Sequence, residues 1–420
     1  MLGTLKIFIL LFSLEEEIKM AEEGQLGGIQ YYVSLEIKNK KYNPVNITFL
    51  IIREWIFNIL PTIEIQLVDD GYLIEKSPME DSEEIKVILA KHENDENPLS
   101  MIFLLDDYDI GILGDNRKSI INITGHLKVS NMFELKNKSF PKQNSSSVLA
   151  EIANNSKLKF SNPFKIVPSD NMTWYQSNQS NFDFIRHVLK RSYVPDDVLF
   201  CYADIYSNLF YTSLNSGIGN EKYRKAKFDI KKAESDVVDK KYKDDTIWFA
   251  SYSIVNKSGY FNKRIGYCGS YNYYDLNVGI SNPYSKTKTL TTLSFRDKNQ
   301  ANKSVENETF RDYNESTLYS TSYFESIVRN KFLKENFFAN SLVLNINSLS
   351  TVKLMDKIDL YVPSLFKPTE SNEVMSGMYL VAGIQHEISR GGVYKKKIAL
   401  GRNGMNKSSD IKIYTVEENK

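Results

Sequence analysis

The chain has 420 residues, of which 42 % are hydrophobic and 25 % are charged, which is enough material for two to four packed domains and excludes a disordered protein. Its 53 Lys and Arg residues balance 52 Asp and Glu residues, so no net field draws the chain to nucleic acid or to acidic lipid. We therefore expect protein partners and no sequence-specific recognition of nucleic acid.

The aromatic content is high and the cysteine content is low. The chain has 26 Tyr and 23 Phe but only 20 Gly and 11 Pro, a bias that suits half-buried strands and extended interfaces. Its two cysteines, Cys201 and Cys268, lie outside any Cys-x-x-Cys or Cys/His spacing, so we expect neither a disulfide framework nor a zinc site. Each is more simply a small buried hydrophobic residue.

Residues 1–24 are expected to form an N-terminal extension. The apolar run over 7–14 is followed by three glutamates without a small-residue cleavage site, and it is far shorter than the ~20 residues of a membrane-spanning helix. We predict neither secretion nor a membrane span, and Met20 is an alternative start of the chain.

Residues 25–140 predict a first small antiparallel β-barrel. Apolar and polar residues alternate at 32–38 and at 63–67, and turn signals such as Asp70-Gly71 separate the apolar runs. This pattern predicts six or seven strands, with one short helix at 53–60.

Residues 141–243 predict a mixed α+β domain. Lys, Asn, Ser and Pro dominate 133–147, which marks a boundary. Ser147 is expected to cap a helix over 148–154, and Ser180 or Asn181 a second helix over 182–191 whose apolar residues repeat at helical spacing. Strands are expected at 198–203 and 207–214. The Lys- and Asp-rich stretch 225–245 predicts a solvated loop or linker.

Residues 244–405 predict a second β-barrel, with an insertion at about 281–335 and a C-terminal tail over 406–420. The expected strands cover 246–255, 264–276, 341–349, 357–362, 378–388 and 393–400, and Gly391-Gly392 joins the last two as a hairpin. The insertion contains a polar loop over 281–316 and a helix over 322–335. The predicted fold class is therefore β-rich α+β, with two small antiparallel barrels and a mixed unit between them.

The common catalytic motifs are absent from the sequence. None of HExxH, GxSxG, GxxxxGK[ST] and GxGxxG occurs, and the four histidines, His92, His126, His187 and His386, share no metal or nucleophile spacing. We predict no catalytic residue, no cofactor-binding residue and no metal ligand, and therefore no cofactor.

Two groups of residues are weaker candidates for chemistry. Asp106, Asp107 and Asp109 could supply a glycosidase-type carboxylate pair, but their alternation with apolar residues predicts a strand end entering the turn at 111–114. His386 alternates with isoleucines, which predicts a partly exposed or interface histidine instead of a general base.

Two stretches resemble a known family. Residues 147–153 and 174–185, with the pattern Ser-x-x-x-Phe-Ile at 180–185, resemble a helix, loop and capped helix of phage-tail hub proteins. Residues 377–388, continuing through Gly392 to Leu400 and Arg402, resemble the closing hairpin of the same proteins. The resemblance covers about 147–402 and extends to late control protein D-like proteins and to the base of type VI secretion spikes. The chain departs from the family at 355–357, where Met355 replaces the usual glycine of a Gly-Asp/Glu turn.

The resemblance implies a structural virion protein without catalytic residues. It implies a homotrimer whose two tail-tube-like barrels per subunit form a ring of six, joining the hexameric tail tube or its initiator above to a trimeric central spike below. It further implies contacts with neighbouring baseplate proteins and a place in the virion tail baseplate, assembled in the host cytoplasm.

Two alternatives stay open. One is another β-rich tail-tip protein that binds a receptor or carbohydrate through Tyr271, Tyr273, Tyr274 and Tyr284. The other is a tail-associated cell-wall hydrolase that uses Asp106 or Asp109.

Overall fold

The computed structural model describes residues 29–90, 93, 95, 98–113, 118–195, 197–234, 246–256, 268–275, 280–284, 304–312, 340–346, 351–367 and 369–402. The predicted N-terminal extension, the helix over 322–335, the tail over 406–420 and His92 lie outside these residues. Among the helices that the structure describes, none is long and apolar enough to cross a membrane.

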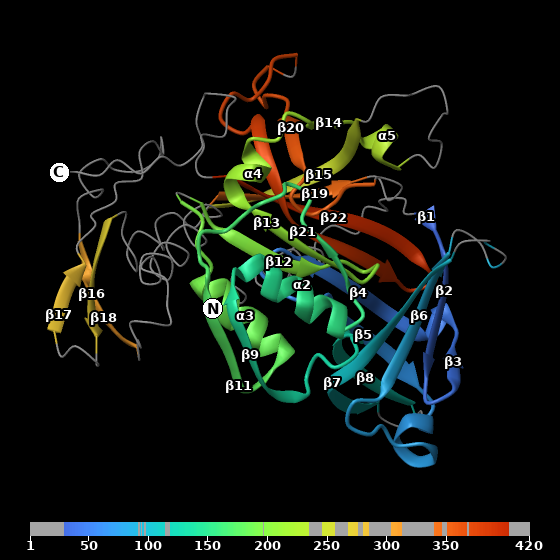
Figure 1. Cartoon of the computed structure of the whole chain (residues 1–420). Coiled ribbons are helices and arrows are strands. Elements are labelled where there is room, and N and C mark those ends of the chain that lie inside the picture. Colours follow the sequence, from blue (N-terminus) through green and yellow to red (C-terminus); the bar gives the residue numbers. More distant parts are fainter. Residues whose placement is uncertain are drawn as a thin grey trace.

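A closed six-stranded barrel occupies the C-terminal part of the chain (Figure 1). Its strands follow the order β22-β19-β15-β14-β20-β21, and the pairing of β21 with β22 closes the ring. Their bounds are β14 (Arg224–Phe228), β15 (Ile247–Asn256), β19 (Asn340–Ile346), β20 (Lys357–Tyr361), β21 (Gly377–Ser389) and β22 (Val393–Arg402). The prediction of a β-rich fold with a closed barrel is confirmed, but this barrel is not wholly antiparallel as predicted, because β14 is parallel to both of its neighbours, β15 and β20.

The N-terminal strands continue the same 14-stranded sheet beyond β21, and we call this part the first barrel. From β4 it runs in the order β4-β5-β8-β7-β6-β2-β3. Its strands are β2 (Tyr32–Ile37), β3 (Lys40–Tyr42), β4 (Ile47–Trp55), β5 (Thr62–Asp69), β6 (Glu84–Ala90), β7 (Leu99–Leu113) and β8 (Lys118–Leu127), with two short helical turns, η1 (Pro44–Asn46) and η2 (Tyr72–Lys76). Alternating burial along β2, β5 and β6 matches the predicted period of two.

One hairpin, β21–β22, belongs to both barrels. Its base pairs with β20 through 377–380, whereas its distal part pairs with β4 through 383–389. At the hairpin tip, β1 (Ile29–Gln30) pairs with β22, and the Tyr31 N–H donates to the Gly392 carbonyl at 2.9 Å. The first barrel therefore curls back onto the same hairpin that closes the second barrel, as Figure 1 shows in red between the blue and orange strands.

The hairpin turn follows from its two glycines. Gly391 and Gly392 both have φ of +82°, a region that side chains with a Cβ rarely adopt. A Cβ on Gly392 would also lie 2.6 Å from the Tyr31 carbonyl oxygen. The predicted Gly391-Gly392 hairpin is confirmed.

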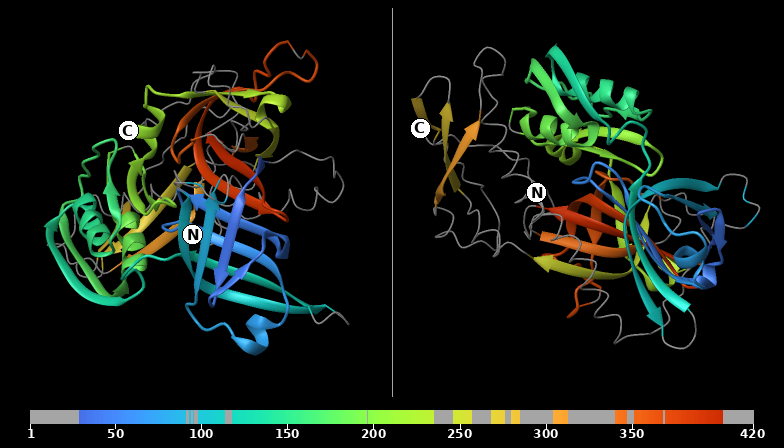
Figure 2. Two further views of the ribbon diagram at one scale, coloured as in Figure 1. Left: turned by 90° about the vertical axis from the view of Figure 1, so that its right-hand side faces the viewer. Right: turned by 90° about the horizontal axis from the view of Figure 1, so that it is seen from below.

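A mixed unit lies beside the barrels, and Figure 2 shows its green helices packed against their own strands. It contains α2 (Ser145–Asn155), α3 (Asn181–Arg191) and α4 (Leu214–Ile218), the ribbon β9 (Leu135–Gln143) with β11 (Met172–Ser180), and the sheet β10 (Lys159–Ser161), β13 (Asn208–Ser213) and β12 (Leu199–Ala203). The Ser180 side chain caps α3 as predicted, but α2 is capped by Asn144 instead of Ser147.

Strand β12 separates two hydrophobic cores. Leu199, Cys201 and Ala203 join the core of the first barrel and the mixed unit, whereas Phe200 and Tyr202 join the core of the second barrel. Because successive side chains of a strand point to opposite faces, a strand between two cores is buried at every position. The prediction that Cys201 is a small buried residue is confirmed.

Three predicted elements were wrong. The helix expected at 53–60 is instead the last three residues of strand β4 followed by a turn, because pairing with β5 and β21 outweighs local helical spacing. The first part of the loop expected at 225–245 is instead barrel strand β14, whose only buried side chain is that of Ala226, followed by the short helix α5 (Ile230–Glu234), and 235–245 lies outside the described residues. The polar loop expected at 281–316 includes β17 (Ile280–Tyr284) and β18 (Ser304–Asp312), which both pair with β16 (Cys268–Asp275). The domain limits at 25–140, 141–243 and 244–405 stay a prediction.

Candidate functional site

A buried polar cluster joins the two barrels at the shared hairpin. His386 of β21 lies between Glu54 of β4 and Tyr394 of β22, with 3.2 Å from its Nε2 to the Glu54 Oε1 and 2.6 Å from its Nδ1 to the Tyr394 hydroxyl. The other Glu54 oxygen accepts the Ile205 N–H of the mixed unit at 3.0 Å. Glu54 is 5 % exposed and His386 is 6 % exposed. The cluster therefore ties all three units together away from solvent.

Strand register brings these residues together. His386 lies opposite Ile52 and Glu54 lies opposite Ile384, so the two polar side chains are diagonal neighbours on one face of the sheet. More than 300 residues separate them in the sequence. No local pattern around Glu54 marks it as a partner of His386, and the sequence analysis missed it.

The burial of the cluster suits a structural contact between strands. Burial lowers the pKa of His386, against the opposing effect of its bond with Glu54, so the imidazole is neutral at neutral pH. Burial also lowers the pKa of the neighbouring Lys396 to about 8. A general base must reach a substrate, and a buried ring with both nitrogens bonded does not. Of the two positions expected for His386, the partly exposed one was wrong, and an interface position stays a prediction.

The lowered pKa of His386 makes stability depend on pH. The unfolded chain binds the histidine proton more readily than the folded chain, so this contribution is complete above the ordinary value of 6.5 and is lost as pH falls below it. We expect the free energy of unfolding, and with it the melting temperature, to fall as the pH drops below about 6.5, with a slope of at most about 1.4 kcal/mol per pH unit from this group. His386→Gln should flatten that part of the profile in a thermal-melting series. Identical pH profiles for the two proteins would contradict this assignment.

Close backbone packing lies next to the cluster. A Cβ on Gly383 would come within 2.1 Å of the Trp55 ring, so the indole of β4 lies directly against the backbone of β21. The pairing of β21 with β22 shifts its register between Val381 and Gly383. A β-bulge of this kind bends a strand, and here the bend lies where the hairpin passes from one barrel to the other.

The turn at 355–357 has a residue with a side chain where the resemblance predicts a glycine. Met355 has φ of +66° and is buried, so a residue with a side chain occupies a left-handed position. Its N–H donates to the Val381 carbonyl at 2.9 Å, and the Asp356 side chain accepts the Lys353 N–H at 2.9 Å. These bonds hold the turn against β21.

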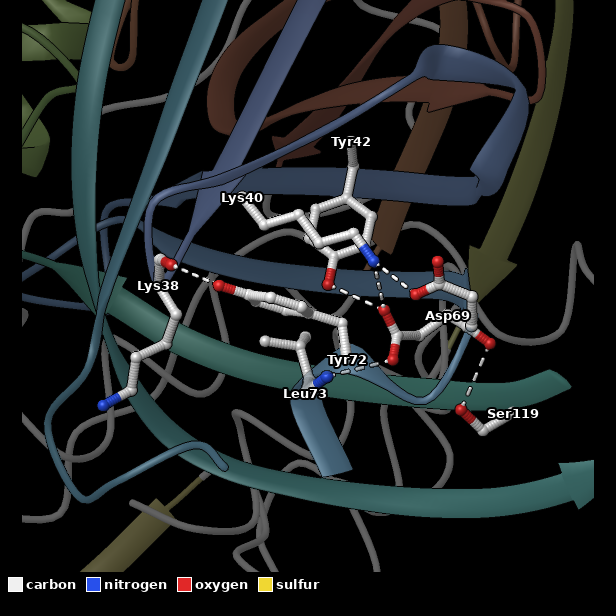
Figure 3. A network of polar contacts seen from close by, with 8 residues as sticks. Lys38, Lys40, Tyr42, Asp69, Tyr72, Leu73 and Ser119 are labelled. Carbon is white, nitrogen blue, oxygen red and sulfur yellow. Dashed lines mark hydrogen bonds and ion pairs between the residues drawn. The ribbon is translucent and has the colours of Figure 1, made fainter. Parts of the chain in front are cut away.

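A second polar network closes the far end of the first barrel (Figure 3). The buried Asp69 accepts hydrogen bonds from the Tyr42 hydroxyl at 2.9 Å and the Leu73 N–H at 3.1 Å, and it pairs with Lys40 at 3.1 Å. Lys40 also pairs with Asp70 at 2.5 Å and lowers the pKa of that carboxyl. Burial opposes the charge of Lys40, but its bonds with Asp70 and Asp69 outweigh burial and raise its pKa. The network fastens edge strand β3 to the end of β5.

The predicted acidic candidates lie elsewhere, along one strand. Asp106, Asp107 and Asp109 are exposed residues of β7, which continues to Leu113 and does not end at 111 as predicted. Asp106 pairs with His126 Nδ1 at 2.5 Å. A single exposed pair of this kind does not make the two facing carboxylates that glycoside hydrolysis needs.

The remaining candidates are dispersed. His187 lies on α3, with its ring centroid 5.7 Å from that of Phe184. Tyr271 lies opposite Tyr284 in the pairing of β16 with β17, and Tyr273 and Tyr274 lie on the same strand β16. Among the residues that the structure describes, no group of three His, Cys, Asp or Glu side chains could hold a metal ion. The expected lack of catalytic, cofactor and metal residues stays a prediction.

Comparisons with known proteins show the fold but not a sequence relative. No family model and no curated protein matches the sequence. A tail protein from Neisseria meningitidis MC58 is similar in structure with a TM-score of 0.54 at 8 % identity, covering 91 % of this chain and 99 % of that chain. The 43 kDa tail protein of prophage MuSo2 from Shewanella oneidensis is similar with a TM-score of 0.51 at 9 % identity, again covering 91 % and 99 %. The chain has the fold of phage tail proteins, as its resemblance to the tail hub family predicted.

Proposed function

We propose that this chain is a structural protein of a phage tail and the subunit of its central baseplate hub. Three copies form a ring of six barrels, which presents near-sixfold symmetry to the hexameric tail tube or its initiator and threefold symmetry to a trimeric spike. The units are those predicted at 25–140, 141–243 and 244–405, with β14 added to the second barrel. The protein is assembled in the host cytoplasm and contacts neighbouring baseplate proteins in the virion.

The shared hairpin carries this proposal. Because β21 pairs with β20 at its base and with β4 further along, the hydrogen bonds of one strand fix the distance and angle between the two barrels. Two barrels held rigidly side by side are the unit that a threefold ring needs to imitate sixfold symmetry. Glu54 and His386 reinforce the same junction from within.

We propose no enzymatic role and no cofactor. The exposed carboxylates at 106–109 lie along one strand, and His386 is enclosed by Glu54 and Tyr394. Both arrangements suit structural work better than turnover.

The solution mass tests the proposed hub. We expect light scattering behind size exclusion to give three times the 48.4 kDa chain mass, independent of dilution over a wide range. A chain that stays monomeric both alone and with its co-expressed spike protein would contradict the hub.

A projecting loop of the second barrel is a candidate contact in the assembly. Between β20 and β21, Phe366 is 96 % exposed and Leu365 is 83 % exposed, and Figure 1 shows this loop projecting at the top. Bonds from the Ser364 N–H to the Glu370 carbonyl at 2.9 Å and from the Phe366 N–H to the Ser364 hydroxyl at 3.3 Å order it. Exposed aromatic side chains on an ordered loop are typical anchors of interfaces.

Removing these two side chains should affect assembly and not folding. Because both side chains are exposed, Leu365→Ser combined with Phe366→Ser is expected to change the free energy of unfolding by no more than about 0.5 kcal/mol, which a thermal melt would show. The same variant should weaken co-purification with tail partners at least tenfold. Lys367→Ser, at the adjacent exposed position, is the matched control. Equal recovery of partners by all three proteins would contradict a contact role for the loop.

A further inference from the structure

Strand β7 has an open edge over its distal part. Strand β6 pairs with β7 only through Leu99–Leu104, and the Leu105 N–H makes one further bond to the Glu83 carbonyl at 2.9 Å. Beyond that point, β7 pairs with no strand except β8 in the part of the chain that the structure describes. Figure 2 (left) shows the teal strands β7 and β8 extending past the other strands of the first barrel. A row of backbone groups along 106–113 is therefore available to another strand.

The two faces of this open segment differ in chemistry. Tyr108 lies opposite Ile123 and Ile110 lies opposite Ile121, and both of these isoleucines are buried in the barrel core. Directly paired residues share a face, so Tyr108 and Ile110 continue the apolar inner face, yet they are 40 % and 38 % exposed. Asp107 lies opposite Thr124 and, like Asp109, on the outer face. The inner face thus extends beyond what the described residues of this chain cover.

Protection against aggregation explains only part of this arrangement. Bulges and charged side chains are common devices that keep an edge from pairing with a like edge, and β7 has both, with a register shift between Leu105 and Asp107. Such a device does not require an uncovered Tyr and Ile on the other face. It also repels an acidic strand while attracting a basic one.

We propose that the edge of β7 over 106–113 takes one more strand from another polypeptide, in which Lys or Arg alternates with apolar residues. The cationic side chains lie beside Asp107 and Asp109 on the outer face, and the apolar ones cover Tyr108 and Ile110. At present the Tyr108 N–H donates to the Asp107 carboxylate at 2.9 Å, and a carbonyl of the added strand replaces this local bond. The proposal is independent of the trimer and goes beyond the hub role.

Hydrogen exchange with defined peptides tests the proposal on the full chain. The probe is a synthetic peptide that alternates Lys with Val, and the controls are the same peptide with Glu in place of Lys and one with Pro in place of alternate Val. We expect the Lys peptide alone to protect alternate amides of 107–111, that of Tyr108 among them, at least tenfold. Raised salt should weaken this protection, because the charges are exposed.

Charge variants decide whether the edge itself is the site. Asp107→Lys with Asp109→Lys should reduce binding of the Lys peptide at least tenfold. Asp81→Lys with Glu93→Lys changes the net charge equally at two other exposed positions and should leave binding unchanged. Protection that depends only on the concentration of the chain would assign the edge to a second copy and overturn the proposal. Equal protection by the Glu peptide, or equal loss in both charge variants, would overturn it as well, while leaving the trimer measurement unaffected.

Discussion

Gly383→Ala is expected to destabilise the folded chain by about 3 kcal/mol, because one added methyl group would lie 2.1 Å from the Trp55 ring. Neither element can yield easily. Trp55 is buried in the second core, and β21 is paired on both sides, to β4 and to β22. The change therefore overpacks the point where the hairpin passes between the barrels. The midpoint of urea unfolding measures the effect.

The control for this prediction is Gly111→Ala on β7. There the nearest atom to an added Cβ is the Ile120 carbonyl oxygen at 3.9 Å, an ordinary contact, so we expect a change within about 0.5 kcal/mol. Trp55→Leu should recover part of the loss when it is combined with Gly383→Ala, giving a coupling energy above about 1 kcal/mol in a double-mutant cycle. Equal midpoints for Gly383→Ala and Gly111→Ala would contradict the close packing.

Glu54→Ala is expected to cost about 3 kcal/mol of folding free energy, because it removes the acceptor of two buried groups at once. The Ile205 N–H and the His386 ring would both lose a partner in a place that water does not reach. Since these bonds join the mixed unit and the hairpin to β4, the loss should also loosen the junction. Hydrogen exchange of the Ile205 amide measures this second effect directly.

Two matched substitutions separate the buried cluster from ordinary charge effects. Glu54→Gln keeps the size and one acceptor oxygen, so it should cost less than Glu54→Ala. Glu64→Ala on neighbouring β5 removes a partner of Arg53 at a partly exposed site, where an ion pair contributes about 1 kcal/mol or less. A loss of folding free energy at Glu64→Ala as large as that at Glu54→Ala would show that the buried cluster contributes no more to stability than a partly exposed ion pair.

Local sequence was sufficient for the elements whose determinants lie within a few residues. The Gly391-Gly392 turn and the Ser180 cap of α3 were predicted because backbone conformation and capping depend on adjacent residues. Alternation predicted the strands of the first barrel because a half-buried strand must alternate. The resemblance to tail hub proteins rested on the same kind of short, ordered pattern, and the structure confirms its fold.

The sequence by itself thus determined the β-rich class, most strands, both long helices of the mixed unit and the closing hairpin. Only the tertiary structure decided that this hairpin closes two barrels, that 53–55 continues a strand, and that β14 belongs to a barrel although only Ala226 of it is buried. Only the tertiary structure placed Glu54 beside His386 and left the edge of β7 over 106–113 without a second partner strand among the described residues. The physical reason is that pairing between distant strands is set by register and shared burial over the whole sheet, whereas sequence patterns report only the preferences of neighbouring residues.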